Sequence, residues 1–83
     1  MKIEVFGPGC ARCEQTHTLV RNVLARLNVT ADLEYITDIR TMAGRGILIT
    51  PAVAIDGTMV SSGHVPKEAK IEEWIRERLP EQP

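Results

Sequence analysis

The sequence predicts an α/β domain in which a four-stranded mixed sheet carries three helices. Short β-branched and aromatic runs alternate with segments whose apolar residues recur at helical spacing, which gives the order βαβαββα. Helices between the early strands favour parallel pairing, and an Asp-Gly turn near the end favours an antiparallel hairpin. At 83 residues the chain has the length of one domain, so we expect residues 1–83 to form a single domain.

The first half of the chain contains two predicted strands and a long helix. Residues 2–6, KIEVF, predict a strand that the Gly-Pro-Gly segment at 7–9 ends. Apolar residues at helical spacing predict a helix from about residue 11 to residue 27. Residues 30–37, TADLEYIT, alternate apolar and polar side chains, with one lapse at Ile36, and therefore predict a second strand.

A short second helix is predicted after this strand. Thr37 or Asp38 is suited to cap it, and Gly44 and Gly46 would close it after Ile39, Met42 and Ala43.

The remaining residues predict a hairpin and a closing helix. Residues 52–55, AVAI, and 58–62, TMVSS, flank Asp56-Gly57, which is a strong signal for a two-residue hairpin turn. From residue 67 to residue 79 the apolar residues lie on one helical face, and Pro80 would end the helix.

The charge distribution indicates which partners to exclude. Ten basic and eleven acidic residues are interspersed along the chain, so no basic surface for nucleic acid or an anionic membrane is expected. The apolar run at the N-terminus is too short for a signal-peptide core, and no later segment approaches membrane-spanning length. We therefore expect a cytoplasmic protein that uses neither nucleic acid nor a membrane as a partner.

The two cysteines of the chain, Cys10 and Cys13, lie in the motif GPGCARC where the first strand leads into the first helix. Cytosolic thiols are mostly kept reduced, so a CxxC pair there indicates redox activity or metal binding rather than a structural disulfide. A bridge across so short a loop would also add little stability, because it removes little chain entropy from the unfolded state.

Thiol–disulfide exchange needs one accessible thiolate and a second thiol that releases the product, and the i, i+3 spacing supplies both. Cys10 should face the unpaired N–H groups at the helix start, which lower the pKa of a thiol. The turn ending at Gly9 should expose Cys10, and Arg12 should add a nearby cation. Cys13, one turn into the helix, should be more buried.

Metal binding is the alternative that the same thiols leave open. Two thiolates form only half of a tetrahedral zinc site, and the chain has no second CxxC. His17 lies on the same helical face as Cys10 and Cys13, so a Cys-x2-Cys-x3-His ligand set is sterically possible. We expect His17 to be a bystander, and we expect no bound metal and no cofactor.

Two further features bear on the site. Glu4 precedes Cys10 by six residues, and a buried acid that assists proton transfer is the alternative to the favoured interpretation, a solvated strand residue. Ile47, Leu48 and Ile49 form an apolar run beside a glycine. At least one should enter the core, and the others would offer an exposed apolar surface to a client protein.

Three segments, KIEVFGPGCARC, TPAVAIDG at residues 50–57 and VSSGHVPKEAKIEEW from Val60, resemble the small glutaredoxin-like proteins of the thioredoxin fold that are described as redox-active disulfide protein 2. The resemblance spans nearly the whole chain. It implies a thioredoxin-like fold and a thiol–disulfide oxidoreductase or electron carrier that acts on protein disulfides.

The resemblance also implies roles for particular residues. Cys10 would be the nucleophile, Cys13 would resolve the mixed disulfide, and Pro51 would follow a cis bond. Thr50 would then offer its backbone groups to an extended substrate beside Cys10. The motif CARC lacks an internal proline and no acidic residue follows Gly63, which are places where glutaredoxins hold glutathione. We therefore expect a reductase of the thioredoxin-reductase type as the electron donor.

Overall fold

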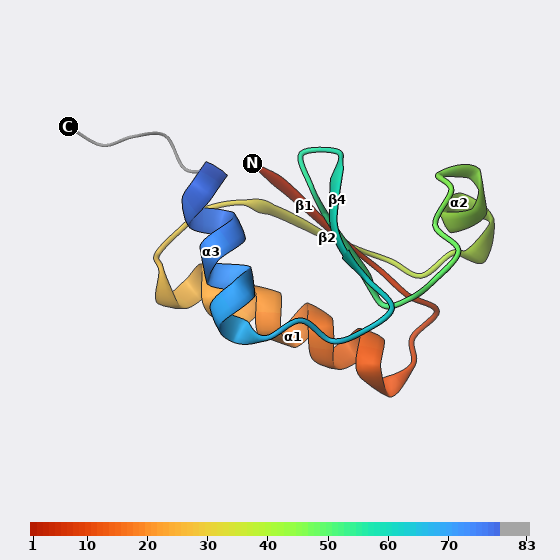
Figure 1. Ribbon diagram of the computed structural model, residues 1–83, viewed down its shortest axis with the longest axis horizontal. Coiled ribbons are helices and arrows are strands. Elements are labelled where there is room, and N and C mark those ends of the chain that lie inside the picture. The colour runs from red at the N-terminus through yellow and green to blue at the C-terminus, as the bar shows by residue number, and fades with distance from the viewer. Residues whose placement is uncertain (79–83) are drawn as a thin grey trace.

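The computed structural model describes residues 1–78 of the chain. Its elements follow the predicted order (Figure 1) and are β1 (Lys2–Phe6), α1 (Ala11–Arg26), β2 (Asp32–Ile36), α2 (Ile39–Gly44), β3 (Ala52–Ile55), β4 (Thr58–Ser62) and α3 (Glu68–Arg78). The βαβαββα prediction is confirmed. Leu79 and Pro80, where the last helix was expected to end, lie outside the described residues.

The four strands form one mixed sheet in the order β2-β1-β3-β4. Strand β1 is central, pairing in parallel with β2 from Lys2 opposite Asp32 to Phe6 opposite Ile36, and antiparallel with β3. Strands β3 and β4 form the expected antiparallel hairpin, with a register shift between Val53 and Ala54. Because β1 is an inner strand, the turn that follows it lies between neighbouring strands at one end of the sheet.

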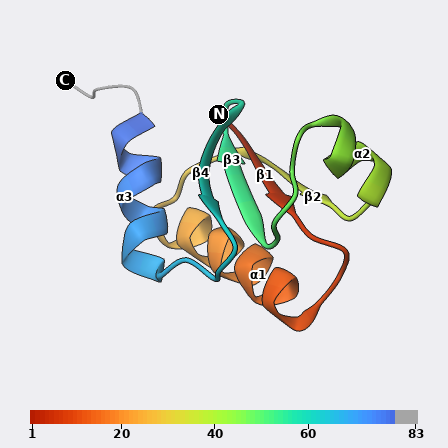
Figure 2. The same ribbon diagram turned by 45° about the vertical axis from the view of Figure 1, so that its right-hand side comes forward.

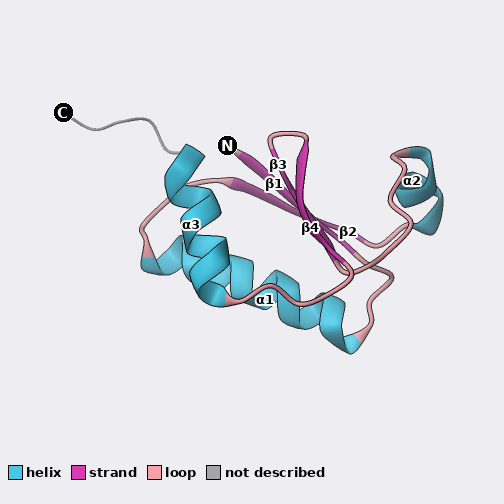
Figure 3. Cartoon of the chain, in the orientation of Figure 1, coloured by secondary structure: helices cyan, strands magenta, loops and turns pink. Residues whose placement is uncertain are grey.

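Helices cover both faces of the sheet (Figures 2 and 3). On one face α1 and α3 lie together, and their apolar residues join those of the strands in one core: Ile3, Val5, Val20, Val23, Leu24, Val53, Ile55, Ile71 and Ile75. On the other face α2 covers a smaller core of Phe6, Ile36, Met42, Ile47, Ala52 and Ala54. Burial of each larger aliphatic or aromatic side chain stabilises the fold by roughly 1.5–3 kcal/mol.

The boundaries differ from the prediction by a few residues. Strand β2 is shorter than residues 30–37 because its partner β1 has only five residues to pair with it. Helix α1 ends at Arg26, and the Leu27 N–H donates to the Val23 carbonyl as a cap. Asp38 caps α2 as expected, since its carboxylate accepts from the Arg40 N–H at 3.1 Å. No helix within residues 1–78 is long and apolar enough to cross a membrane.

Candidate active site

Cys10 occupies the N-cap position of α1, and its side chain is exposed. Its Sγ accepts a hydrogen bond from the Cys13 N–H at 3.3 Å, and its carbonyl accepts from the Glu14 N–H at 3.0 Å. The thiol therefore takes the place that a Ser or Asp oxygen often fills at a helix start. A sulfur in this position lies at the positive end of the helix dipole, which favours an anion.

Hydrogen bonding lowers the pKa of Cys10 below that of an ordinary cysteine. The largest contribution comes from the Cys13 thiol and the next from the Cys13 N–H, while partial desolvation opposes them. Arg12 also contributes, through its backbone N–H. Sequence analysis expected the Arg12 guanidinium to act on the thiol, but the contribution comes from the main chain, which the helix start directs at the sulfur.

Cys13 has the opposite environment. Its side chain is fully buried, and burial raises the pKa of its thiol, with the neighbouring Cys10 raising it further. Both thiols are free. The pair therefore combines an exposed sulfur that ionises readily with a buried sulfur that holds its proton, as the sequence predicted.

Two glycines shape the turn before the cysteines. A Cβ on Gly7 would overlap the Cys13 Sγ and Cβ, so only glycine lets the end of β1 pass this close to the thiol. The Gly7 N–H donates to the Ile36 carbonyl at 3.0 Å, which ties the turn to the end of β2. Gly9 has a φ of +94°, a conformation that side chains disfavour, and it leads directly into Cys10.

The segment before β3 lies beside this turn. The Thr50-Pro51 bond is cis, as the family resemblance implied, and Pro51 is buried. Its carbonyl accepts from the Gly63 N–H at 2.9 Å, which fixes the segment to the end of β4. Thr50 and Pro8 line the same hollow. The fold thus brings residue 50 next to the turn that carries Cys10, although the two are distant in sequence.

An exposed apolar surface continues from this hollow. Ile47 is buried, whereas Leu48 and Ile49 are 88% and 61% exposed, so the run divides between core and surface as expected. Leu48 also lines the hollow beside Pro8, and a second hollow joins Leu48 and Ile49 to Met59. We call the exposed side chains of Ile39, Leu48, Ile49 and Met59 the Leu48 surface.

The favoured interpretation of Glu4 as a solvated residue is wrong. Glu4 is 5% exposed and receives two hydrogen bonds of 2.8 Å from the Arg45 guanidinium. These bonds lower the pKa of its carboxyl. Since β1 places Ile3 and Val5 on the α1 face, Glu4 faces α2, where Arg45 also stacks 5.1 Å from the Phe6 ring centre. Glu4 is therefore an ionised structural partner and holds no proton to transfer at neutral pH.

His17 does not join the thiols as a ligand. Its ring stacks on Tyr35, with 4.8 Å between the ring centres and 15° between the planes. Within residues 1–78, no group of three or more His, Cys, Asp or Glu side chains is arranged to hold a metal ion.

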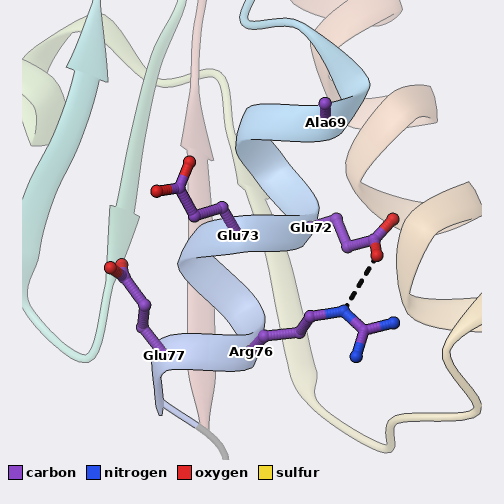
Figure 4. Close-up of a pocket in the computed structure, with 5 residues that line it drawn as sticks. All are labelled: Ala69, Glu72, Glu73, Arg76 and Glu77. Atoms are coloured by element: carbon purple, nitrogen blue, oxygen red, sulfur yellow. Dashed lines mark hydrogen bonds and ion pairs between the residues drawn. The ribbon is translucent and has the colours of Figure 1, made fainter.

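A separate hollow runs along α3 (Figure 4). It is lined by Ala69, Glu72, Glu73, Arg76 and Glu77. Glu72 accepts from Arg76 at 2.8 Å and from Arg26, the last residue of α1, at 2.8 Å. Because Cys10 lies at the other end of the sixteen-residue α1, this hollow is about 24 Å along the helix from the thiols and does not belong to their site.

Sequence analysis missed three residues of this region: Gly7, Tyr35 and Arg45. A glycine between a strand and a CxxC motif is a signal for close backbone approach, and it was available. Arg45 gave no signal, since 41 residues separate it from Glu4. The strand prediction placed Tyr35 on one face of β2 but did not identify which helix covers that face.

Comparison with known proteins agrees with this geometry. The profile of the family described as thioredoxin domain matches residues 1–76. A protein named thioredoxin from Methanocaldococcus jannaschii is 32% identical over 77 residues, which cover 93% of this chain and 88% of the relative. Another, also named thioredoxin, from Methanothermobacter thermautotrophicus is 29% identical over 75 residues, or 90% of this chain and 97% of the relative.

Proposed function

Because this chain belongs to the thioredoxin family, we propose that its thiol–disulfide oxidoreductase activity runs through Cys10 as nucleophile and Cys13 as resolving thiol. The observation that carries this assignment is the contrast between the two sulfurs. Cys10 is exposed with a lowered pKa, and Cys13 is buried with a raised pKa. Attack on a protein disulfide requires an accessible thiolate, which only Cys10 offers.

The cycle has two exchange steps. In the first, the Cys10 thiolate attacks one sulfur of the substrate disulfide, a Cys10–substrate disulfide forms, and the other substrate sulfur leaves as a thiolate. In the second, Cys13 loses its proton and attacks the Cys10 Sγ, which breaks the bond to the substrate and forms the Cys10–Cys13 disulfide. The substrate gains two electrons, and the protein must then be reduced again.

Protein disulfides suit this site as substrates. The cis segment offers the backbone groups of Thr50 beside the turn of Cys10, where an extended peptide pairs as a temporary strand. The Leu48 surface continues from that place, and apolar surface of this kind is typical of protein contacts. Gly9 and Arg12 support the site by shaping the turn and by directing a backbone N–H at the Cys10 sulfur.

We assign the electron donor to the thioredoxin-reductase class and the protein to the cytoplasm, where such reductases keep dithiols reduced. The sequence lacks the acidic residue after Gly63 by which glutaredoxins hold glutathione. Faster reduction by glutathione with its own reductase than by a thioredoxin-reductase-type enzyme would contradict this assignment of the donor.

The metal-binding alternative is not favoured, since the family match indicates thiol–disulfide exchange. A redox titration of the purified protein against mixtures of oxidised and reduced dithiothreitol tests the choice. Alkylation of the free thiols reports the reduced fraction at each point of the titration. We expect both cysteines to change together in a single transition with the slope of a two-electron couple. Stoichiometric zinc or copper that survives purification and blocks alkylation of both thiols would select the alternative.

A further inference from the structure

Tyr35 has a hydroxyl group that the fold buries without a partner. The oxygen is closed to solvent and has no hydrogen-bond partner among residues 1–78. A buried hydroxyl in this state costs about 1–3 kcal/mol, so such groups usually have a structural or catalytic reason. The Glu14 carboxylate lies close enough to the hydroxyl for hydrogen bonding to raise the pKa of Tyr35, but the two groups lack the geometry of a full hydrogen bond.

The position of Tyr35 places this hydroxyl in the region of the resolving thiol. Its ring stacks on His17, which lies one helical turn after Cys13 on the same face of α1. From the other side, Cys13 packs against Gly7, whose N–H bonds to the carbonyl of the residue after Tyr35. Charges on Cys13 and Cys10 act on the Tyr35 hydroxyl, so the hydroxyl lies near both thiols, and stacking on His17 fixes the ring against α1.

Four titratable groups lie around the Tyr35 side chain: Cys10, Cys13, Glu14 and His17. Burial raises the pKa of Tyr35 most, hydrogen bonding to Glu14 raises it next, and negative charge on Glu14, Cys13 and Cys10 raises it further. The phenol therefore keeps its proton at neutral pH and can donate a hydrogen bond. The turn at residues 7–9 and the segment at 50–51 contain no titratable side chain.

The resolving step requires a negatively charged thiolate on Cys13, near the Tyr35 hydroxyl. Cys13 must ionise inside the protein, although burial disfavours its thiolate. Glu4 does not assist, because Arg45 holds its carboxylate on the opposite face of the sheet. A fixed donor that is unsatisfied in the resting state and satisfied by the developing anion stabilises the transition state with little reorganisation.

We propose that the Tyr35 hydroxyl donates a hydrogen bond to the Cys13 thiolate as Cys13 resolves the mixed disulfide. In this step the Cys13 proton passes to solvent, the Cys13–Cys10 S–S bond forms, and the Cys10–substrate S–S bond breaks with its electron pair on the substrate sulfur. The inference rests on the proposed function, since it assigns a donor to that same resolving thiol.

The test uses DTNB, a disulfide that releases one coloured thiolate at each exchange step. Rapid mixing with the reduced protein separates attack by Cys10 from resolution by Cys13, and both phases are followed across a range of pH. Tyr35→Phe removes the hydroxyl and keeps the stacked ring. Ser61→Ala is the matched control, because Ser61 carries the other buried hydroxyl without a partner in the described chain and lies on the edge strand β4, opposite Val53.

We expect Tyr35→Phe to move the pH midpoint of the second phase upward by about one unit, the value of one hydrogen bond to a charged group. At neutral pH the second phase should slow about threefold, since the smaller thiolate fraction is partly offset by a more nucleophilic thiolate. The first phase should change little. The shift should persist in a Glu14→Gln background, and Ser61→Ala should leave the midpoint in place.

An unchanged midpoint in Tyr35→Phe, equal slowing of both phases, a matching shift in Ser61→Ala, or loss of the shift in the Glu14→Gln background would each overturn the role of Tyr35. The proposed function fails separately, if the unmodified protein itself shows no second phase.

Discussion

At Gly7 the main chain passes so close to Cys13 that one added methyl group would collide with the thiol. The same residue ties the turn to the end of β2 through its N–H. The absence of a side chain at Gly7 therefore leaves the space that the buried Cys13 thiol fills. This is the residue on which the geometry of the pair depends most directly.

Gly7→Ala should destabilise the protein by about 1–3 kcal/mol, the usual cost of overpacking a filled core. It should also slow resolution, since the Cys13 thiol must leave the position it now occupies. Urea unfolding and the DTNB second phase measure the two effects. Gly44→Ala is the control, because a methyl there meets open space at the end of α2 and should be neutral or stabilise by up to about 1 kcal/mol. Equal unfolding midpoints for Gly7→Ala and the unmodified protein would show that the contact is not restrictive.

The helix α2 depends on a pairing that no local signal in the sequence reveals. Arg45, which follows the helix, is 39% exposed in its side chain, while the Glu4 side chain is 7% exposed. Their two hydrogen bonds connect α2 to the central strand β1, and the guanidinium also covers Phe6. The segment that leads to Leu48 and Thr50 is thus anchored at its start.

Stability should depend on the ionisation of Glu4. Its pKa is lower in the folded protein than its ordinary value of 4.5, so its contribution is present above that value and is lost as the pH falls through the folded pKa. In Arg45→Met the carboxylate is left buried without its partner, which should cost roughly 2 kcal/mol at neutral pH. The variant should lose less on acidification, because protonation relieves the buried charge.

Urea unfolding of Arg45→Met at neutral and at acidic pH measures this dependence. Arg40→Met, which removes an exposed cation from α2, should follow the unmodified protein at both pH values. If Arg45→Met retained the same acid-induced loss as the unmodified protein, the pairing would not be the source of the pH dependence.

Most elements could be predicted because their signals are local. The β-branched and aromatic run of β1, the alternation in β2, the helical period of α1 and the Asp-Gly turn all lie within short windows of sequence. Even α2 was predicted from its Asp38 cap. The ends of β2 were wrong by one or two residues, because pairing with the short β1, rather than the alternation itself, sets its length.

The sequence predicted the part of the site that lies within the CxxC motif. The exposed Cys10 and the buried Cys13 could be predicted from their positions at the start of a helix and one turn inside it. The unpaired N–H groups and the positive dipole end of a helix stabilise a thiolate at its start. The surroundings of Cys13 could not be predicted, because Gly7 approaches Cys13, and Tyr35 approaches the neighbouring His17, only through the packing of β1, β2 and α1. The same limit explains Glu4, whose partner is 41 residues away and whose face depends on which helix covers each side of the sheet.

At the scale of the whole molecule, the sheet gathers the site at one end. The turn after the central β1, the segment before β3 and the exposed apolar side chains meet there, whereas the charged hollow of α3 lies at the other end of α1. Arg26 bridges α1 to Glu68 and Glu72 of α3 at 3.0 and 2.8 Å. These exposed pairs add little stability. The proposed substrate surface and the ion pairs between α1 and α3 thus lie at opposite ends of α1.

In the proposed cycle Cys10 attacks and Cys13 resolves, and single-cysteine variants distinguish these two roles. Each variant is incubated with an oxidised protein substrate, quenched in acid, and analysed on gels with and without reductant. We expect Cys13→Ser to accumulate a mixed disulfide that reductant dissolves, because the exposed Cys10 still attacks and nothing releases the product. Cys10→Ser should accumulate none. Trapping through Cys13 instead, or equal trapping by both variants, would contradict the assignment.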